Sequence, residues 1–195
     1  MKNFEVLKTE VVARMKKELP SGLYYHGAQH TLDVISAAEF IGKKEGLSTT
    51  DLSVVLYAAL FHDTGFLMTY ENHEAAGCRI AREVLAKYNY SDEFISSICE
   101  IIMCTKYPPD PKNLPARVLC DADLDYLGRD DFFTIGLKLF HELIFFGKVK
   151  DESAWNKLQI KFLESHSYFT KTSRESRQNK KIENLLILKR EMKGK

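Results

Sequence analysis

The sequence lacks the features that mark exported, membrane-spanning or strongly charged proteins. No segment approaches the roughly 18 consecutive apolar residues of a membrane-spanning helix, and the N-terminal segment, MKNFEVLKTEVVARMKKELP, has no uninterrupted apolar stretch like that of a signal peptide. Neither sign of charge predominates, because 28 lysines and arginines are balanced by 27 aspartates and glutamates. A general attraction to nucleic acid polymers or to membranes is therefore not expected. We predict a cytoplasmic protein that recognises any charged ligand locally.

Cysteine is scarce, and no two cysteines form a C-x-x-C motif. The four are Cys78, Cys99, Cys104 and Cys120. Each lies in an apolar segment with helical spacing, where a thiol commonly behaves as a small hydrophobic group. We expect all four to be reduced residues of the core.

Alternating runs rich in Val, Ile and Thr, which would predict strands, are also missing. Apolar residues recur instead at spacings of three and four, which predicts an all-α fold. The chain is long enough for one ordinary domain of roughly 100–200 residues. Helices are expected at about residues 3–18, 30–44, 51–63, 73–88, 92–106, 115–127, 131–147, 152–169 and 173–192. The third is expected to end at Gly65 in a left-handed turn.

The segment AALFHDTGF, residues 58–66, ends an apolar run in two ionisable residues. On a helix, Asp63 continues the line of Leu56 and Ala59, and His62 continues the neighbouring line. A buried, unpaired carboxylate is so unfavourable that it normally neutralises or finds a partner, and His62 alone is too weak a partner. A cation held by several elements would explain the pair. The alternative is a helix end where both side chains are exposed and bonded to loop backbone groups.

Two more ionisable residues fall on inward-facing lines of other predicted helices. His30 begins a line that continues through Val34, and Asp123 shares a line with Leu119. Asp121 lies on a different line, so we expect it to support the site from outside the ligand set or to lie on the surface.

Two imidazoles and two carboxylates form a mixed nitrogen and oxygen donor set. Such a set suits a divalent transition metal such as Mn, Fe, Co, Ni or Zn. Coordination positions left open would take water or substrate. A metal in that state acidifies bound water and polarises a phosphoryl oxygen, which is the basis of metal-assisted hydrolysis.

The constellation His30, then adjacent His62 and Asp63, then Asp123 resembles the metal-binding signature of the HD-domain superfamily of metal-dependent phosphohydrolases. The local sequence is also similar to that of its small bacterial members. The matching segments, which occur in the expected order over about residues 25–130, are YHGAQHTLDV, AALFHDTGF, NHEAAGCRIA, TKYPPDP and LCDADLDYLG.

The resemblance implies an all-α, HD-domain-like helical bundle. It implies one HD-type domain over residues 1–195, with a motif core at about 25–130 and accessory C-terminal helices at about 131–195. His30, His62, Asp63 and Asp123 would hold one divalent metal ion, which could be Mn, Fe, Co, Ni, Zn or Mg. A phosphate ester, commonly in a nucleotide-like molecule, would then be hydrolysed by metal-activated water.

Asp63, His73 and Lys106 are the candidate catalytic residues. Asp63 would help to orient the water, and His73 or Lys106 would stabilise charge on the phosphate. His73 points inward at a predicted helix start, where it could instead join a second metal or simply pack as a structural histidine. Lys106 lies near a helix C-terminus, where the dipole favours a cation whatever its function. Related small proteins resemble this one except that histidine usually occupies the position of Tyr107, which weakens the case for a second metal.

Other ionisable and aromatic residues are expected to be less central. His26 is a candidate to support the site from the loop before His30, whereas His141 and His166 are interpreted as ordinary helix residues. The aromatic residues of the later helices follow helical spacing, which predicts core with some lining a substrate pocket. A solvated helix face is expected for the basic run Arg174, Arg177, Lys180 and Lys181.

We therefore predict a phosphohydrolase acting on a small phosphorylated substrate, with nucleotides as one candidate class. Two alternatives stay open. A di-iron oxygenase of the same fold would need further ligands, and a non-catalytic nucleotide sensor would use the metal to fix an anionic ligand. The sequence also allows a homodimer.

Overall fold

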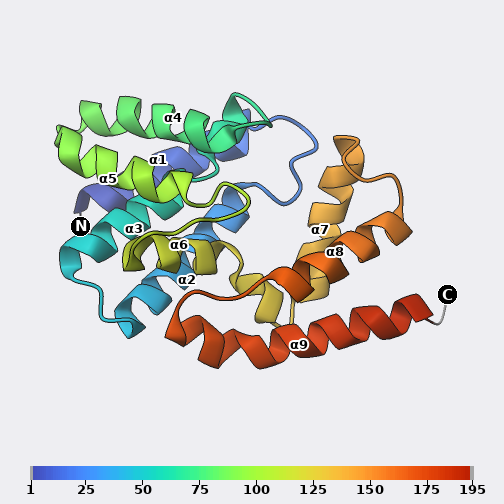
Figure 1. Cartoon of the computed structure of the whole chain (residues 1–195). Coiled ribbons are helices and arrows are strands. Elements are labelled where there is room, and N and C mark those ends of the chain that lie inside the picture. The colour runs from blue at the N-terminus through green and yellow to red at the C-terminus, as the bar shows by residue number, and fades with distance from the viewer. Residues whose placement is uncertain (1, 194–195) are drawn as a thin grey trace.

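Helices account for all the regular secondary structure in residues 2–193, the part of the chain that the computed structural model describes. In chain order the elements are α1 (Lys2–Glu18), α2 (Ala28–Lys44), α3 (Thr49–Phe61), the 3-10 helix η1 (Thr64–Leu67), α4 (His73–Lys87), α5 (Asp92–Met103), α6 (Leu114–Asp123), the 3-10 helix η2 (Asp125–Gly128), α7 (Phe132–Phe145), α8 (Glu152–Ser165) and α9 (Lys171–Lys193). The predicted all-α fold is confirmed (Figure 1).

The third helix, α3, is the centre of the bundle because its sequence is apolar on every side. All residues from Val54 to Phe61 are buried. A helix that is apolar all round has to be enclosed by other elements, and α1, α2, α4, α5 and α6 contact it. The end of α3 therefore delivers the next two residues, His62 and Asp63, to the interior, where both are buried.

Two separate hydrophobic clusters divide the apolar residues. The larger is formed by α1 to α6 and includes Leu7, Ile41, Phe61, Leu85 and Leu119. The smaller joins η2 and the loop before α2 to the last three helices, through Tyr25, Tyr126, Leu127, Phe132, Leu163 and Leu188. Figure 1 shows α7, α8 and α9 gathered on one side of the other helices.

Two predicted helices end four residues earlier than expected. The helix predicted over about residues 115–127 stops at Asp123, and the one predicted over about 152–169 stops at Ser165. Asp121 explains the second difference, because its carboxylate accepts hydrogen bonds of 2.8 Å from the backbone N–H groups of Phe169 and Thr170. These bonds hold a non-helical connection ahead of α9. Asp121 is fully buried, so of the two positions that we expected, the one on the surface is wrong.

The basic run on α9 is only partly the solvated face that we predicted. Lys181 is buried, donates to the backbone carbonyl of His166 and lies over the ring of Tyr168. Arg177 donates to the carboxylate of Asp125 at 2.7 Å. These contacts attach α9 to η2 and to the connection after α8, which a pattern of alternating charges alone does not indicate.

Gly65 does not adopt the left-handed turn that we predicted, and another constraint explains the glycine. Its φ lies outside the positive range, but a Cβ at this position would lie 1.8 Å from the carbonyl oxygen of His73 and 2.7 Å from the backbone nitrogen of Gly77. A Cβ at Gly77 would lie 2.8 Å from the carbonyl oxygen of Phe61. The start of α4 thus packs directly against the backbone around His62.

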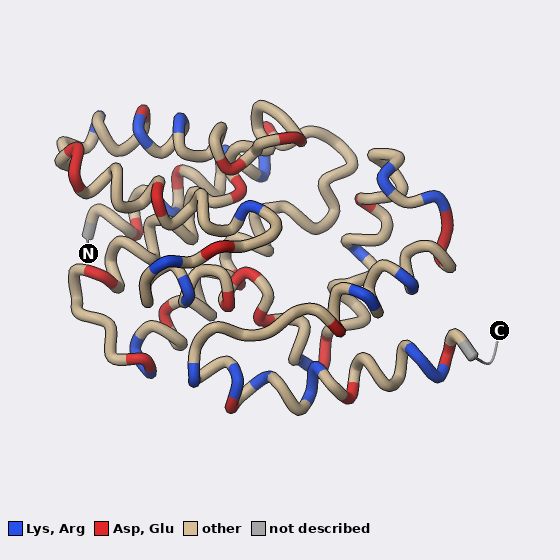
Figure 2. The backbone as a smooth tube through the Cα atoms, viewed as in Figure 1, with Lys and Arg blue, Asp and Glu red and all other residues tan. Residues whose placement is uncertain are grey.

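Charged residues of both signs are interspersed over the fold, as Figure 2 shows. No helix in the described part of the chain combines the length and the apolar content that crossing a bilayer requires.

Candidate metal centre

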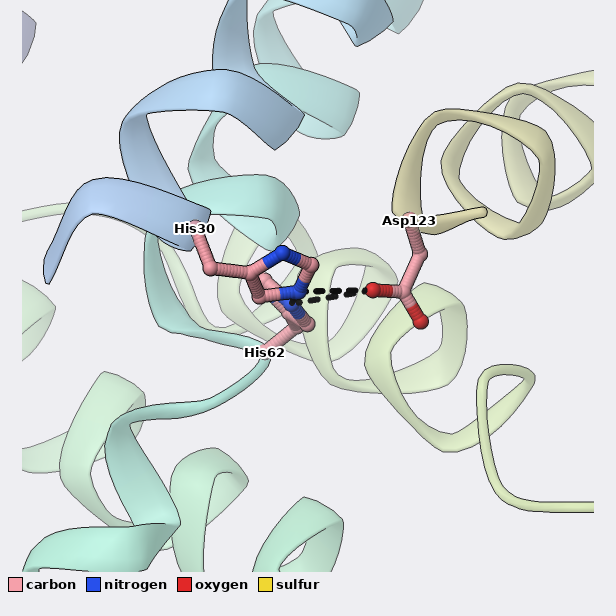
Figure 3. Close-up of side chains that lie close together, drawn as sticks. All are labelled: His30, His62 and Asp123. Atoms are coloured by element: carbon pink, nitrogen blue, oxygen red, sulfur yellow. Dashed lines mark hydrogen bonds and ion pairs between the residues drawn. The ribbon is translucent and has the colours of Figure 1, made fainter. Parts of the chain in front are cut away.

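Three side chains from three separate helical segments converge on one point (Figure 3). His30 lies in the first turn of α2, His62 follows the last residue of α3, and Asp123 is the last residue of α6. The Nε2 atom of His30 lies 2.9 Å from Oδ1 of Asp123 and 3.4 Å from Nε2 of His62. One donor atom from each of the three lies within 4.8 Å of the others. Donors that surround one ion at roughly 2.0–2.2 Å would be spaced in this way.

Asp63 adds a fourth donor at the same point. Its Oδ2 lies 3.3 Å from Nε2 of His62 and 3.5 Å from Nε2 of His30. This oxygen is buried and makes no hydrogen bond within the described residues. A buried, unsatisfied carboxylate oxygen is unfavourable unless another group binds it. The structure therefore brings all four predicted ligand residues together, with Oδ2 of Asp63 beside both imidazoles.

The backbone fixes which nitrogen of His62 faces the centre. Nδ1 of His62 lies 2.8 Å from the carbonyl oxygen of Ala59, to which it can only donate a proton. In the neutral ring Nε2 then carries the lone pair, and a metal-binding histidine is usually oriented by such a bond from its other nitrogen.

The charges at the centre are strongly coupled. Burial alone would lower the pKa of His62, but the carboxylates of Asp63 and Asp123 outweigh burial and raise it well above 6.5. Burial alone would raise the pKa of Asp63 and of Asp123, but the neighbouring imidazoles hold both well below their usual range. Among the described side chains, neither carboxylate forms an ion pair with lysine or arginine. Two ionised carboxylates and two imidazoles without another cation fit a divalent ion in charge and in donor type.

His73 lies beside the centre rather than within the group of closest donors. Its Nε2 is 3.7 Å from Oδ1 of Asp63, whereas His30 and His62 approach the other carboxylate oxygen, Oδ2. Its ring stacks on Phe66, with centroids 4.0 Å apart. The expected inward orientation at a helix start is therefore observed, and a role in binding phosphate stays a prediction.

Glu142, which we did not predict from the sequence, lies close to the site. Glu142 lies on α7 with a fully buried side chain, and it accepts hydrogen bonds from the backbone N–H groups of Tyr25 and His26 at 2.9 and 3.1 Å. It also forms an ion pair with the ring of His26, which itself stacks on Phe66. A signal was available, because Glu142 is the only carboxylate in an otherwise largely apolar helix.

His26 and Glu142 each shift the pKa of the other in the direction that favours a charged pair. Burial alone would lower the pKa of His26, but its hydrogen bond to Glu142 raises it. Burial alone would raise the pKa of Glu142, and the bond from His26 lowers it. His26 is therefore attached to α7 through Glu142, a contact that we did not expect.

Lys106 and Tyr107 lie at the edge of the site. Lys106 is exposed and donates to Oδ1 of Asn72 at 3.0 Å, next to His73 in the chain; it makes no ion pair with the donors described above, as far as the described residues show. Tyr107 is 70% exposed and lies against Phe162. A catalytic role for Lys106 stays a prediction.

A cavity of about 580 Å³ opens beside the centre, and Asp123 and His26 are among the residues that line it. The other walls come from η2, α7 and α8. A ligand in this cavity would reach Asp123, one of the four candidate metal ligands.

Comparison with solved structures supports the fold that carries this centre. A predicted HD superfamily hydrolase from an uncultured Thermotogales bacterium is 20% identical, with a TM-score of 0.63 and coverage of 97% of this chain and 91% of that protein. YpgQ from Bacillus subtilis, solved in complex with ADP, is 19% identical, with a TM-score of 0.66 and coverage of 98% and 96%. At these identities the likeness shows a shared fold.

Sequence comparison identifies the family. A curated protein from Clostridium beijerinckii, described as uncharacterized, is 33% identical over 81 residues, which are 40% of this chain and 51% of that protein. The chain thus spans about half the length of that relative. The family model described as HD domain matches residues 27–125, half of the chain, and this range contains all four candidate ligands. The protein therefore belongs to the HD-domain family, as its sequence motifs predicted.

Proposed function

We propose that the chain is a metal-dependent phosphohydrolase that cleaves a phosphate ester of a small molecule. The observation that carries the proposal is the buried Oδ2 of Asp63, which lacks a hydrogen-bond partner among the described residues and lies 3.3 and 3.5 Å from two imidazole nitrogens. His30, His62, Asp63 and Asp123 would hold one divalent ion. When bound, such an ion acidifies a water molecule and polarises a phosphoryl oxygen.

The chain's own residues have separate tasks in this proposal. His62 keeps its Nε2 lone pair directed at the centre through the bond between Nδ1 and Ala59. Asp63 would accept a hydrogen bond from the attacking water at Oδ1, while its Oδ2 lies beside the two imidazoles of the centre. His73, 3.7 Å from Oδ1, would donate to the phosphate.

The substrate reaches these groups through the cavity that Asp123 and His26 line. Nucleotides are the first class to test, because YpgQ, which shares the fold, was solved with ADP. Whether this chain takes a nucleotide is part of the proposal.

Elemental analysis and a phosphatase screen test the proposal together. Purified protein should hold one divalent ion per chain, and it should release phosphate from at least one ester with Mn, Fe, Co, Ni, Zn or Mg. Asp63→Ala should lose both the ion and turnover while keeping its helical circular dichroism spectrum. His141→Ala, an exposed histidine on α7, is the matched control and should keep both. Bound metal and full turnover in Asp63→Ala would refute the assignment, and two irons with oxygen consumption would replace it with an oxygenase.

A further inference from the structure

Two cavities reach Asp123, and they differ in size and chemistry. The smaller has a volume of about 70 Å³ and is lined partly by polar groups such as Gln29, Asp33 and Arg129. It holds a few water molecules at most, since each occupies roughly 30 Å³ in the liquid. The larger, of about 580 Å³, lies within the usual range of roughly 300–1,000 Å³ for small-molecule sites. Only the larger one can take the organic part of a substrate.

The walls of the larger cavity are mainly hydrocarbon. The apolar lining residues come from the loop before α2, η2, α7 and α8: Tyr25, Leu124, Tyr126, Leu127, Phe132, Leu139, Leu143, Trp155, Leu158, Phe162 and Leu163. Charged groups occur at the inner end, where Asp123 and His26 lie, and at the exposed Lys161. The charged groups at the candidate centre are thus separate from the apolar walls formed by η2 and α7, while α8 also contributes the polar residues Gln159, Lys161 and Ser165.

This separation matches a ligand with a charged head and an apolar body. Burying apolar surface is favourable by an amount that corresponds to roughly a fourfold gain in affinity for each methylene group. A sugar or a second phosphate would instead lose hydration against these walls, because the lining residues of η2 and α7 are all apolar or aromatic.

Building on the phosphohydrolase function proposed above, we propose that the substrate is a phosphate monoester of an apolar alcohol. The phosphate lies at the inner end, beside Asp123 and His26, and the hydrocarbon or aromatic part lies between α7 and α8. Hydrolysis breaks the bond between phosphorus and the alcohol oxygen and forms one between phosphorus and a water oxygen. One water proton ends on the alcohol, so the products are the free alcohol and hydrogen phosphate.

The outer end of the cavity fits a body of variable length. Leu158 on α8 is 47% exposed, and Tyr107, 70% exposed, lies with its ring centroid 6.0 Å from that of Phe162. These residues form an apolar rim that is open to solvent. A chain longer than the cavity can therefore extend past them.

The test compares monoesters that differ only in the alcohol. With the metal-loaded protein, kcat/KM is measured for methyl, butyl, hexyl and octyl phosphate, for 1-naphthyl phosphate, and for AMP and glucose 6-phosphate. We expect kcat/KM to rise about three- to fourfold per methylene up to the length that fills the cavity. The naphthyl ester shows whether a flat aromatic body serves as well as an alkyl chain.

A variant pair assigns the preference to this cavity. Leu158→Glu places a carboxylate on its wall, and Leu186→Glu places one on α9, away from the lining residues; both leucines are 47% exposed, so both variants should fold. Leu158→Glu should reduce the octyl-to-methyl ratio of kcat/KM at least tenfold, whereas Leu186→Glu should leave the ratio unchanged.

The outcomes separate the two proposals. Turnover with equal kcat/KM across chain lengths, or with AMP preferred to octyl phosphate, overturns the apolar-alcohol assignment and keeps the hydrolase. No turnover of any ester, together with octylphosphonate binding at least tenfold tighter than methylphosphonate by calorimetry, overturns the hydrolase and supports the cavity assignment. Absence of both turnover and length-dependent binding overturns both.

Discussion

Replacement of Glu142 with glutamine should loosen the attachment of α7 to the loop that leads into the metal centre. The carboxylate accepts two backbone N–H groups and pairs with the ring of His26. Hydrogen bonds to a charged group contribute about 1.5–3 kcal/mol, against about 0.5–1.5 kcal/mol for neutral ones. Glutamine keeps an acceptor but loses the charge, so we expect the free energy of unfolding to fall by about 2 kcal/mol.

Replacement with alanine should be more damaging, because it removes the acceptor altogether. Two buried N–H groups and the His26 ring would lose their partner, and breaking a buried pair by removing one member costs about 3–5 kcal/mol. Urea unfolding followed by circular dichroism measures both variants. With a slope near 2 kcal/mol per molar urea, the midpoint should fall by about 1 M for Glu142→Gln and by about 2 M for Glu142→Ala. Glu175→Gln, an exposed residue of α9, should leave the midpoint unchanged.

The loss in Glu142→Gln should depend on pH in a defined way. The pKa of Glu142 is lowered from 4.5, so its contribution is present above that value and is lost as the pH falls through the folded pKa. The pKa of His26 is raised from 6.5, so its contribution is complete below that value and is lost as the pH rises through the folded pKa. The difference between wild type and variant should therefore be largest between about pH 4.5 and 6.5. A difference below about 0.5 kcal/mol, or one that is equal at pH 5.5 and 9, would refute this reasoning.

Three further predictions concern the metal, the backbone and the thiols. The raised pKa of His62 keeps its ring protonated in the metal-free protein, so metal binding should release about one proton and should strengthen as the pH rises. Calorimetry in two buffers counts the released protons, and no release would contradict the assignment of His62 as a metal ligand. In Gly65→Ala the new Cβ would lie 1.8 Å from the carbonyl oxygen of His73, so the free energy of unfolding should fall by about 1–3 kcal/mol and the metal content should decrease. An unchanged urea midpoint would contradict the observed packing. In the native protein, a thiol reagent should modify the half-buried Cys104 before the three buried cysteines, Cys78, Cys99 and Cys120, and equal rates at all four would be inconsistent with the fold.

The convergence of the candidate ligands was predictable because helical spacing and the HD motif agree. His30 and Asp123 fall on inward lines of their helices, and the structure brings them to His62. The reason for Gly65 could not be predicted, since its constraint is the carbonyl group of His73 in another helix. A close approach between two backbones leaves the same glycine in the sequence as a left-handed turn does.

The pairing of Glu142 with His26 was harder to predict, because this contact joins distant segments of the chain. Glu142 and His26 are separated by more than one hundred residues, and periodicity indicates only which face of one helix is buried. The same limit applies to Lys181 and Arg177, whose partners lie outside α9. The composition of α7 identifies Glu142 as unusual, but only the fold identifies what it binds.

The close packing of Gly65 and Gly77 restricts the movement of His62 and Asp63, whereas Asp123, on another helix, is less restricted. The backbone at Phe61, His62 and Gly65 lies close to Gly77 of α4, which leaves His62 and Asp63 little room to shift. Asp123 ends α6, and its side chain is 24% exposed. Ions that differ in radius or preferred ligand number would therefore be accommodated by Asp123. Since Asp123 also lines both cavities, a change of metal in the proposed hydrolase would reshape the proposed substrate site, so the identity of the ion would alter which substrate is preferred as well as how fast it reacts.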